Sequence, residues 1–197
     1  ELAQILKDIF IEIVVAPSFE KEALTILSTK KNLRLLEIQD IKNQNRRYEV
    51  RNLNGGILVQ QENNDILKID ELKLVTNTKP SDDTIKSMLF GWQVLKHVKS
   101  NAIITIKDNT TVGIGAGQVS RIDAVDIAIS KSKDAISGSV LCSDAFFPFR
   151  DSIDKISQYN LNGVIQPGGS IKDNEVIDAC NEHKIPMVFT GRRCFKH

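Results

Sequence analysis

The order of apolar and polar residues predicts short helices and strands from the first residue onward. Residues 1–10, ELAQILKDIF, have helical spacing, and no capping residue precedes them. Because the chain begins at Glu1 without an initiator methionine, we expect it to be part of a longer polypeptide. The β-branched run IEIVVAP, which Pro17 ends, predicts a buried strand.

A helix, a strand and a hairpin are predicted next. Residues 18–32 have helical spacing with Ser18 as the expected N-cap, and LRLLEI predicts a short strand. The Asn-Gly-Gly turn at residues 54–56 tolerates positive φ and predicts a β-hairpin within RRYEVRNLNGGILVQQEN. Residues 63–79 are polar with little periodicity, so we expect them to be a connection across the surface.

The clearest helical pattern begins at Pro80 and Ser81. Its apolar residues recur every three or four positions: Ile85, Met88, Leu89, Trp92 and Leu95. Residues 101–117 then predict a hairpin around an Asp-Asn turn. Further along, the predicted strands GSVLCSD, GVIQPGG and MVFTG alternate with the predicted helices SIDKISQY and DNEVIDACNEHK. Such alternation requires crossover connections, so we expect an α/β fold with a mixed sheet and helices on its faces.

Composition excludes several classes of protein. The chain has 197 residues, 41% of them hydrophobic and 26% charged, as in an ordinary globular protein. A net charge of +1 gives no basic field for nucleic acid, and no apolar run approaches the ~20 residues of a membrane span. Three cysteines, Cys142, Cys180 and Cys194, cannot all pair with one another, so we expect reduced thiols and a cytoplasmic location.

The run VGIGAGQVSR is a glycine-rich turn between a predicted strand and a predicted helix. The helix has a capping-box pattern, with Ser120 as N-cap and Asp123 three residues later. The glycines have two interpretations: backbone N–H groups that approach an anionic ligand, or tight packing of strand against helix. Arg121, in the first helical turn, opposes the helix dipole, which favours the ligand interpretation, because a bound anion would neutralise its charge.

Three predicted strand ends carry unusual residues. They are Gly115 to Arg121, Asp144 to Asp151, and Gln166 to Ile171, where Ser170 and Asp173 are candidate helix caps. Ligands of open α/β sheets collect at the carboxyl ends of strands, so we expect a binding site where these segments meet. The alternative is three ordinary turns.

Two C-x-x-H pairs near the end of the chain have the residue types of a zinc site. They are Cys180 with His183, and Cys194 with His197. Cys180 also belongs to the apolar face of a predicted helix, so a buried thiol is the competing interpretation, and we expect no metal. The terminal RRCFKH is either a solvated tail or a tail that folds over an anionic ligand.

Several runs together resemble the AICAR transformylase/IMP cyclohydrolase family over nearly the whole chain. They are APSFEKEALTIL, VKSNAI, VGIGAGQVSRIDAV, SDAFFPFRD, IQPGGSIKDNEVIDAC and the final FKH. The resemblance implies a transformylase domain of two lobes like those of cytidine deaminase but without zinc. It implies that residues 1–79 are the remainder of the first lobe and a connection, and that residues 80–197 are the second lobe.

The resemblance also implies an activity: transfer of a formyl group from 10-formyltetrahydrofolate to the nucleotide AICAR, which gives FAICAR. It implies a homodimer with active sites at the subunit interface. The cyclohydrolase domain and the family's catalytic lysine–histidine pair are not in this chain, and Lys96-His97 does not match that pair. An inactive nucleotide-binding or dimerisation chain, or an unrelated nucleotide-binding α/β domain, are the alternatives.

Individual residues match family positions. The expected AICAR contacts are Glu12, Asn101, Arg121, Phe146 and Arg193, and Asn101 is also a candidate oxyanion donor. The expected folate contacts are Ile122, Asp151, Ser170 and Ile171. The phenylalanines of SDAFFPFRD are expected to form an apolar wall for a pterin or imidazole ring, with Asp151 as a hydrogen-bond acceptor.

Overall fold

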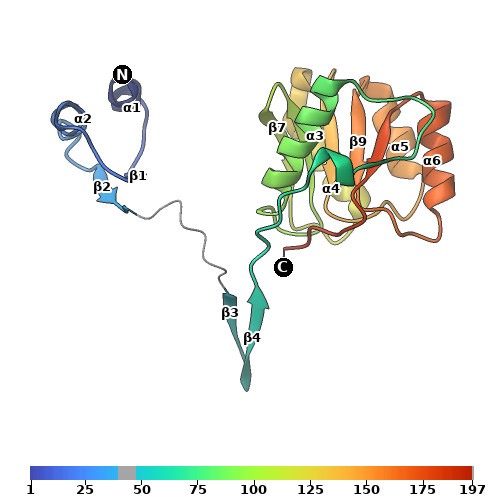
Figure 1. Ribbon diagram of the computed structural model, residues 1–197, viewed down its shortest axis with the longest axis horizontal. Helices are drawn as coiled ribbons and strands as arrows, with labels where there is room; N and C mark the ends of the chain where they lie inside the picture. The colour runs from blue at the N-terminus through green and yellow to red at the C-terminus, as the bar shows by residue number, and fades with distance from the viewer. Residues whose placement is uncertain (40–47, 197) are drawn as a thin grey trace. The chain divides into compact units, whose positions relative to one another are not determined.

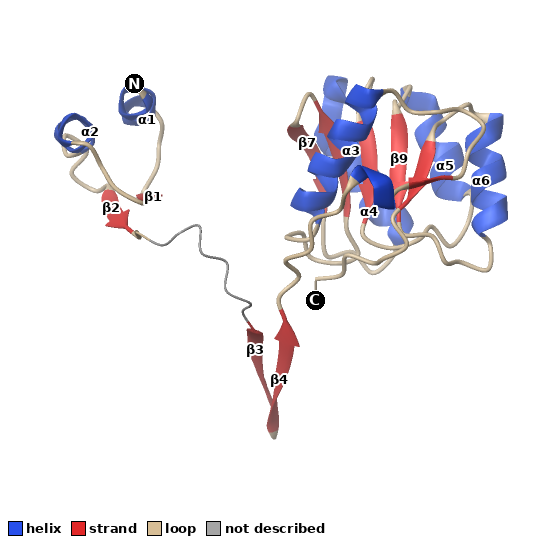
Figure 2. Cartoon of the chain, viewed as in Figure 1, coloured by secondary structure: helices blue, strands red, loops and turns tan. Residues whose placement is uncertain are grey.

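The computed structural model describes residues 1–39 and 48–196. The chain divides into two compact units, Glu1–Glu62 and Asn63–His197, and each is described by itself. Figures 1 and 2 show the elements of both units. None of the described helices has the length and apolar character that a membrane span requires.

The first unit contains the predicted elements in the predicted order. They are α1 (Leu2–Asp8), β1 (Ile13–Ala16), α2 (Lys21–Leu27), β2 (Arg34–Glu37), β3 (Tyr48–Leu53) and β4 (Gly56–Gln61). Strands β1 and β2 pair in parallel, and β3 and β4 form the predicted antiparallel hairpin, with Gly55 at a φ of 86° in the turn. The start of the predicted hairpin, Arg46-Arg47, lies outside the described residues.

Two predictions for the first unit are wrong. Strand β1 is not buried: Ile13 is 53% and Val15 43% exposed, because β1 has a single neighbouring strand in this unit. Ser18 does not cap α2 either. The helix starts only at Lys21, and Glu20 occupies the N-cap position without a side-chain hydrogen bond.

The second unit is built on a six-stranded mixed sheet in the order β5-β10-β9-β8-β6-β7. Its strands are β5 (Lys73–Leu74), β6 (Ile103–Lys107), β7 (Thr110–Gly115), β8 (Val140–Ser143), β9 (Gly163–Gln166) and β10 (Met187–Phe189). Strands β8, β9 and β10 are parallel, whereas β5 and the β6–β7 hairpin pair antiparallel with their neighbours. The predicted α/β class with a mixed sheet is confirmed.

One segment of this unit differs from its prediction. Residues 63–79 are not only a surface connection, because they contain the short 3-10 helix Ile69–Glu71 and the edge strand β5. Leu74 and Lys73 pair with Val188 and Phe189 of β10. A strand of two residues has no alternation that a sequence pattern could reveal.

Helices cover both faces of the sheet, as Figure 2 shows. Helix α3 (Asp82–Leu95) packs on one face, and α4 (Arg121–Ser132), α5 (Asp151–Ile156) and α6 (Asp173–Glu182) pack on the other. Two further 3-10 helices follow α4 and α5, at Lys133–Ile136 and Ser157–Tyr159. Successive residues of a strand alternate between the two cores: Leu141 packs with α4–α6 and Cys142 with α3.

Local signals in the sequence explain where these elements begin. The Ser81 hydroxyl accepts a hydrogen bond from Thr84 N at 3.2 Å, and the Ser120 hydroxyl accepts one from Asp123 N at 3.2 Å, so both predicted N-caps are confirmed. The Asp-Asn turn between β6 and β7 has positive φ at both residues, 49° and 55°. This geometry matches the right-handed twist of the two strands.

The cysteines of the two C-x-x-H pairs lie on opposite sides of the sheet. Cys180 is buried in the core beneath α4–α6, and Cys194 is buried in the core beneath α3. Burial raises the pKa of both thiols to about 12, the negative charge of Asp144 contributing at Cys194. The sheet therefore separates the two cysteines, and the buried-thiol interpretation of Cys180 is confirmed. His197 lies outside the described residues.

Candidate functional site

The sheet topology brings the three unusual strand ends to one edge. Strands β7 and β8 are both antiparallel to β6, so they run in the same direction as each other and as β9 and β10. The segments that follow these strands, and residues 99–102 that precede β6, therefore share an edge. The expected convergence of the three strand ends at one edge of the sheet is confirmed.

The glycine-rich turn packs strand against helix. A Cβ atom on Gly113 would lie 2.1 Å from the Ala128 carbonyl oxygen, and one on Gly115 would lie 2.0 Å from the Ala124 carbonyl oxygen. Both oxygens belong to the backbone of α4, so β7 and α4 approach closely only because these residues lack side chains. Of the two interpretations, tight packing therefore explains Gly113 and Gly115.

A buried ion pair lies behind the turn. Asp144 is fully buried and Arg121 is 8% exposed. The Arg121 guanidinium donates to the Asp144 carboxylate, to the Ala102 carbonyl at 3.1 Å and to Asn101 Oδ1 at 3.1 Å. Asp144 neutralises Arg121, so the position of Arg121 in the first helical turn no longer favours a bound anion.

Asp144 has further partners, and they join the site to the end of the chain. Its Oδ2 accepts hydrogen bonds from Ser100 Oγ at 2.5 Å and from Ala102 N at 3.1 Å. Its backbone carbonyl accepts from Cys194 N at 2.9 Å. No motif in the sequence assigned a role to Asp144; the one signal is its place directly after a buried strand, at a predicted site edge.

The end of the chain folds against this edge. Ser100 N donates to the Lys196 carbonyl at 2.8 Å, and Lys196 N donates to Ser100 Oγ at 3.0 Å. Arg192 pairs with Glu71 and with Asp65. The solvated-tail interpretation of RRCFKH is therefore wrong for Arg192, Cys194 and Lys196, whereas Arg193 is exposed.

A cavity of about 390 Å³ opens between these segments. Its lining residues are Asn101, Val119, Ser120, Arg121, Ala145, Phe146, Pro148, Arg193 and Phe195. Four of the five expected AICAR contacts thus line one cavity: Asn101, Arg121, Phe146 and Arg193. The fifth expected contact, Glu12, belongs to the first unit. Sequence reasoning did not identify Phe195 or Val119 as lining residues.

The expected donor amide of Asn101 is already engaged. Its Nδ2 donates to the carbonyl oxygens of Gln118 at 2.8 Å and Val119 at 3.0 Å, and its Oδ1 accepts from Arg121. An amide nitrogen has two hydrogens, so both are used within the protein. Asn101 therefore holds the glycine-rich turn in place, and it reaches an oxyanion only by giving up one of these bonds.

The three phenylalanines of SDAFFPFRD have three different environments. Phe147 is fully buried in the core beneath α4–α6, and its N–H donates to Gln166 Oε1 at 3.0 Å. Phe149 is 50% exposed beneath the Lys172 ammonium, which lies 4.4 Å from the ring centroid. Only Phe146 lines the cavity, together with Pro148, so the expected apolar wall of three rings is wrong.

The expected folate contacts lie at the same edge but do not line this cavity. Ile122 is in the first turn of α4, and Asp151 is the first residue of α5, where its carboxylate accepts from Ser152 N at 2.7 Å. Ser170 and Ile171 lie in the loop between β9 and α6, where Ile171 is fully exposed.

The turn before α6 is capped from inside the helix. The Asp173 carboxylate accepts from Gly169 N at 2.7 Å and Ser170 N at 3.1 Å. The N-cap residue of α6 (Asp173–Glu182) is Lys172, whose side chain accepts no hydrogen bond from the first turn of the helix. The expectation that Ser170 and Asp173 cap this helix is therefore wrong. Asp173 instead fixes the loop that carries Ser170.

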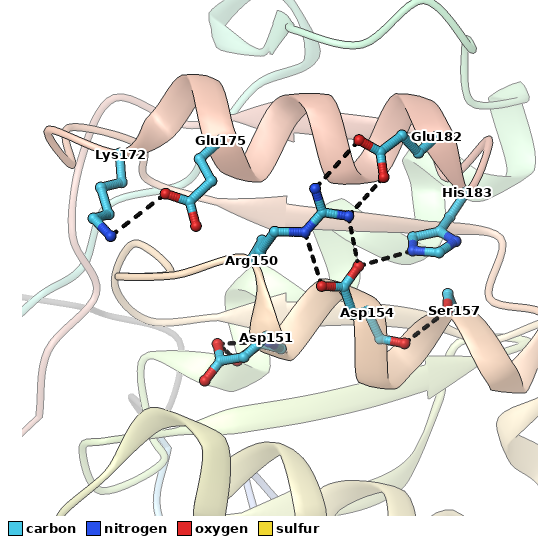
Figure 3. A network of polar contacts seen from close by, with 9 residues as sticks. Arg150, Asp151, Asp154, Ser157, Lys172, Glu175, Glu182 and His183 are labelled. Atoms are coloured by element: carbon cyan, nitrogen blue, oxygen red, sulfur yellow. Dashed lines mark hydrogen bonds and ion pairs between the residues drawn. The ribbon is translucent and has the colours of Figure 1, made fainter.

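A charged network joins α5 to α6 beside the site (Figure 3). Arg150 donates to Asp154 at 2.8 and 2.9 Å and to Glu182 at 2.6 and 3.2 Å, and His183 Nε2 lies 2.9 Å from Asp154 Oδ1. Hydrogen bonds from Arg150, and then from His183, lower the pKa of Asp154 to about 2. Through Arg150, the network fixes the C-terminal end of the segment Asp144 to Asp151, which carries Phe146.

The lowered pKa of Asp154 predicts how Asp154→Asn changes stability with pH. The ionised Asp154 carboxylate adds to the free energy of unfolding at pH values above its unfolded pKa of about 3.9. This stabilisation is lost as the pH falls towards the folded pKa of about 2. Because Asp154 is 41% exposed, we expect Asp154→Asn to lower the free energy of unfolding by less than about 1 kcal/mol at pH 7, and this difference should disappear near pH 2. Urea denaturation of the variant and the wild type at several pH values measures the difference. Asp178→Asn, on the exposed side of α6, is the control; an equal effect there would contradict the assignment to the network.

A family model and several relatives of this chain point to the same protein family. Residues 1–131 match the AICARFT/IMPCHase bienzyme family. The "Bifunctional purine biosynthesis protein PurH" of Caldicellulosiruptor saccharolyticus is 48% identical over 197 residues, which cover 100% of this chain and 38% of that protein. The PurH proteins of Persephonella marina and Dictyostelium discoideum are also 48% identical, covering 100% of this chain and 39% and 38% of their own lengths. The chain thus spans less than half of these purine-biosynthesis relatives.

Proposed function

Because the chain belongs to the AICARFT/IMPCHase bienzyme family, we propose that it is the C-terminal half of the transformylase in a longer enzyme. This transformylase moves a formyl group from 10-formyltetrahydrofolate to AICAR and gives FAICAR. One observation carries the proposal: four residues expected to contact AICAR, drawn from separate segments of the chain, line a single cavity.

The cavity has the groups that binding of an aromatic nucleotide needs. Phe146 and Pro148 supply apolar surface for the imidazole ring, and Arg193 supplies positive charge for the phosphate. The reaction requires attack of the AICAR amine on the formyl carbon, removal of a proton and stabilisation of an oxyanion. The described lining supports binding more directly than proton transfer.

The rest of the site is proposed around this cavity. Ile122, Asp151, Ser170 and Ile171 form the folate side, and Glu12 of the first unit is a further AICAR contact. The active enzyme is a cytoplasmic homodimer whose subunit interface completes the site. The two units belong to two deaminase-like lobes, the second of which is the unit with the six-stranded sheet.

We expect the 197-residue chain alone to bind AICAR without transferring the formyl group. Within the described part of the chain, the cavity lining includes no histidine, lysine or carboxylate. General acid–base groups contribute roughly 10²–10⁴-fold to such reactions, so little rate should remain without them. Release of tetrahydrofolate from 10-formyltetrahydrofolate in the presence of AICAR measures transfer, and calorimetry measures binding.

The complete enzyme, the natural polypeptide that contains this region, is the control. Transfer by the complete enzyme together with binding but no transfer by the chain would agree with the proposal. A rate for the chain within about tenfold of the complete enzyme would contradict the assignment of its catalytic groups. Absence of transfer by the complete enzyme would reject the proposed function itself.

A further inference from the structure

The two arginines of the cavity have different surroundings. Arg121 is buried, and its guanidinium donates to Asp144, Ala102 and Asn101. Arg193 has no carboxylate partner among residues 1–39 and 48–196. Instead, its guanidinium carbon lies 5.2 Å from the ring centroid of Phe146 and 5.6 Å from that of Phe195. Among the described residues, Arg193 is therefore the cation of this cavity that has no carboxylate counter-ion.

Contact with two aromatic rings orients a guanidinium without neutralising it. The ring faces attract the cation, while the N–H groups at the edge of the guanidinium plane stay able to donate hydrogen bonds. Restricting the rotamers of a long side chain before binding also reduces the conformational entropy lost when a ligand is bound. A guanidinium held in this way is suited to an oxyanion such as phosphate.

The backbone fixes Phe195 in this position. Cys194 N donates to the Asp144 carbonyl, and Lys196 exchanges two hydrogen bonds with Ser100. Both neighbours of Phe195 are thus bonded to segments of the sheet edge, and the Cys194 side chain is 1% exposed. The hydrogen bonds of these two neighbours therefore place the Phe195 ring at the cavity.

We propose that Phe195 is a positioning residue that, with Phe146, holds the Arg193 guanidinium ready for the phosphate of a bound nucleoside monophosphate. The identity of that nucleotide as AICAR rests on the proposed function. Phe195 acts through Arg193, so its removal should weaken binding of the phosphate-bearing ligand and leave binding of the same ligand without phosphate unchanged.

The test compares AICAR with its nucleoside, which lacks the phosphate, by calorimetry on the complete enzyme. We expect Phe195→Leu to weaken AICAR binding about fivefold and to leave nucleoside binding unchanged. Phe195→Tyr, which keeps the ring, should bind AICAR like the wild type. In steady-state kinetics, Phe195→Leu should raise KM for AICAR with kcat nearly unchanged, whereas a general structural defect would lower kcat as well.

Arg193→Met provides the matched control, because it removes the charge that Phe195 is proposed to hold and keeps a long side chain. We expect Phe195→Leu to add no further loss of AICAR affinity in the Arg193→Met background. Unchanged AICAR affinity in Phe195→Leu, equal losses for nucleotide and nucleoside, or a wild type that does not prefer AICAR to its nucleoside would each overturn the assignment. Formyl transfer is measured separately, so failure of the proposed function is distinguished from failure of the role of Phe195.

Discussion

We expect Asp144→Ala to lower the free energy of unfolding of the second unit by about 3–5 kcal/mol, because Arg121 then stays buried without its counter-ion. Asp144 is fully buried, and its carboxylate accepts from Arg121, Ser100 and the backbone N–H of Ala102. These groups lose their acceptor together. Urea denaturation followed by the fluorescence of Trp92, the single tryptophan of the chain, measures the loss.

A double replacement tests the cause of this loss. In Asp144→Ala with Arg121→Met, no charge is left unpaired, so part of the stability should return even though the contacts are not restored. The coupling energy from the four variants isolates the ion pair. A loss below about 1 kcal/mol for Asp144→Ala, or no recovery in the double variant, would contradict the central role of this pair.

The same ion pair changes what Arg121→Ala means for AICAR binding. We would expect the loss of a charged hydrogen bond to ligand to weaken binding by roughly ten- to a hundredfold. In the structure, however, Arg121 also holds Asn101 Oδ1 and balances the buried Asp144. If Arg121→Ala binds AICAR more weakly, the free energy of unfolding of this variant must also be measured. Only a loss of affinity without a matching loss of stability assigns a contact between Arg121 and the ligand.

The elements with strong local signals could be predicted from the sequence. Helix α3 combines a serine N-cap with regular apolar spacing, and the β6–β7 hairpin has a turn that adopts positive φ. Strand β5 could not be predicted, because its two residues form a strand only through pairing with β10. The exposure of β1 depends likewise on how many strands pair with it, which no local pattern contains.

The position of the candidate site in the fold could be predicted from the sequence, but the contacts between its side chains could not. Strand ends with unusual residues indicated the edge, and the family resemblance supplied residues that line one cavity there. The partner of Arg121 was not predictable, because Asp144 lies 23 positions away and any of several acidic residues would satisfy the same charge argument. Similarly, the sequence does not distinguish the buried ring of Phe147 from the cavity ring of Phe146.

We expect Gly115→Ala to destabilise the second unit strongly, because the added methyl group has no room. Its Cβ would lie 2.0 Å from the Ala124 carbonyl oxygen and 3.0 Å from the Ala124 Cα, both backbone atoms of α4. Such a contact is relieved only if β7 and α4 move apart. Overpacking of well-packed sites costs typically 1–3 kcal/mol and occasionally more, and we expect a loss of about 3 kcal/mol here.

Two further variants separate the clash from other effects of replacing Gly115. Gly117→Ala places its Cβ in ordinary van der Waals contact with the Lys99 side chain, at 3.8 Å, but at a φ of +67°, so it should cost only the backbone strain of about 1 kcal/mol. Ser130→Ala, at an exposed position of α4, should stay within about 0.5 kcal/mol of the wild type. Because α4 carries Arg121 at its first turn, Gly115→Ala should also weaken AICAR binding by the complete enzyme, whereas Ser130→Ala should not. If Gly115→Ala unfolds at the same urea concentration as Ser130→Ala, close packing of β7 against α4 is not what the glycine provides.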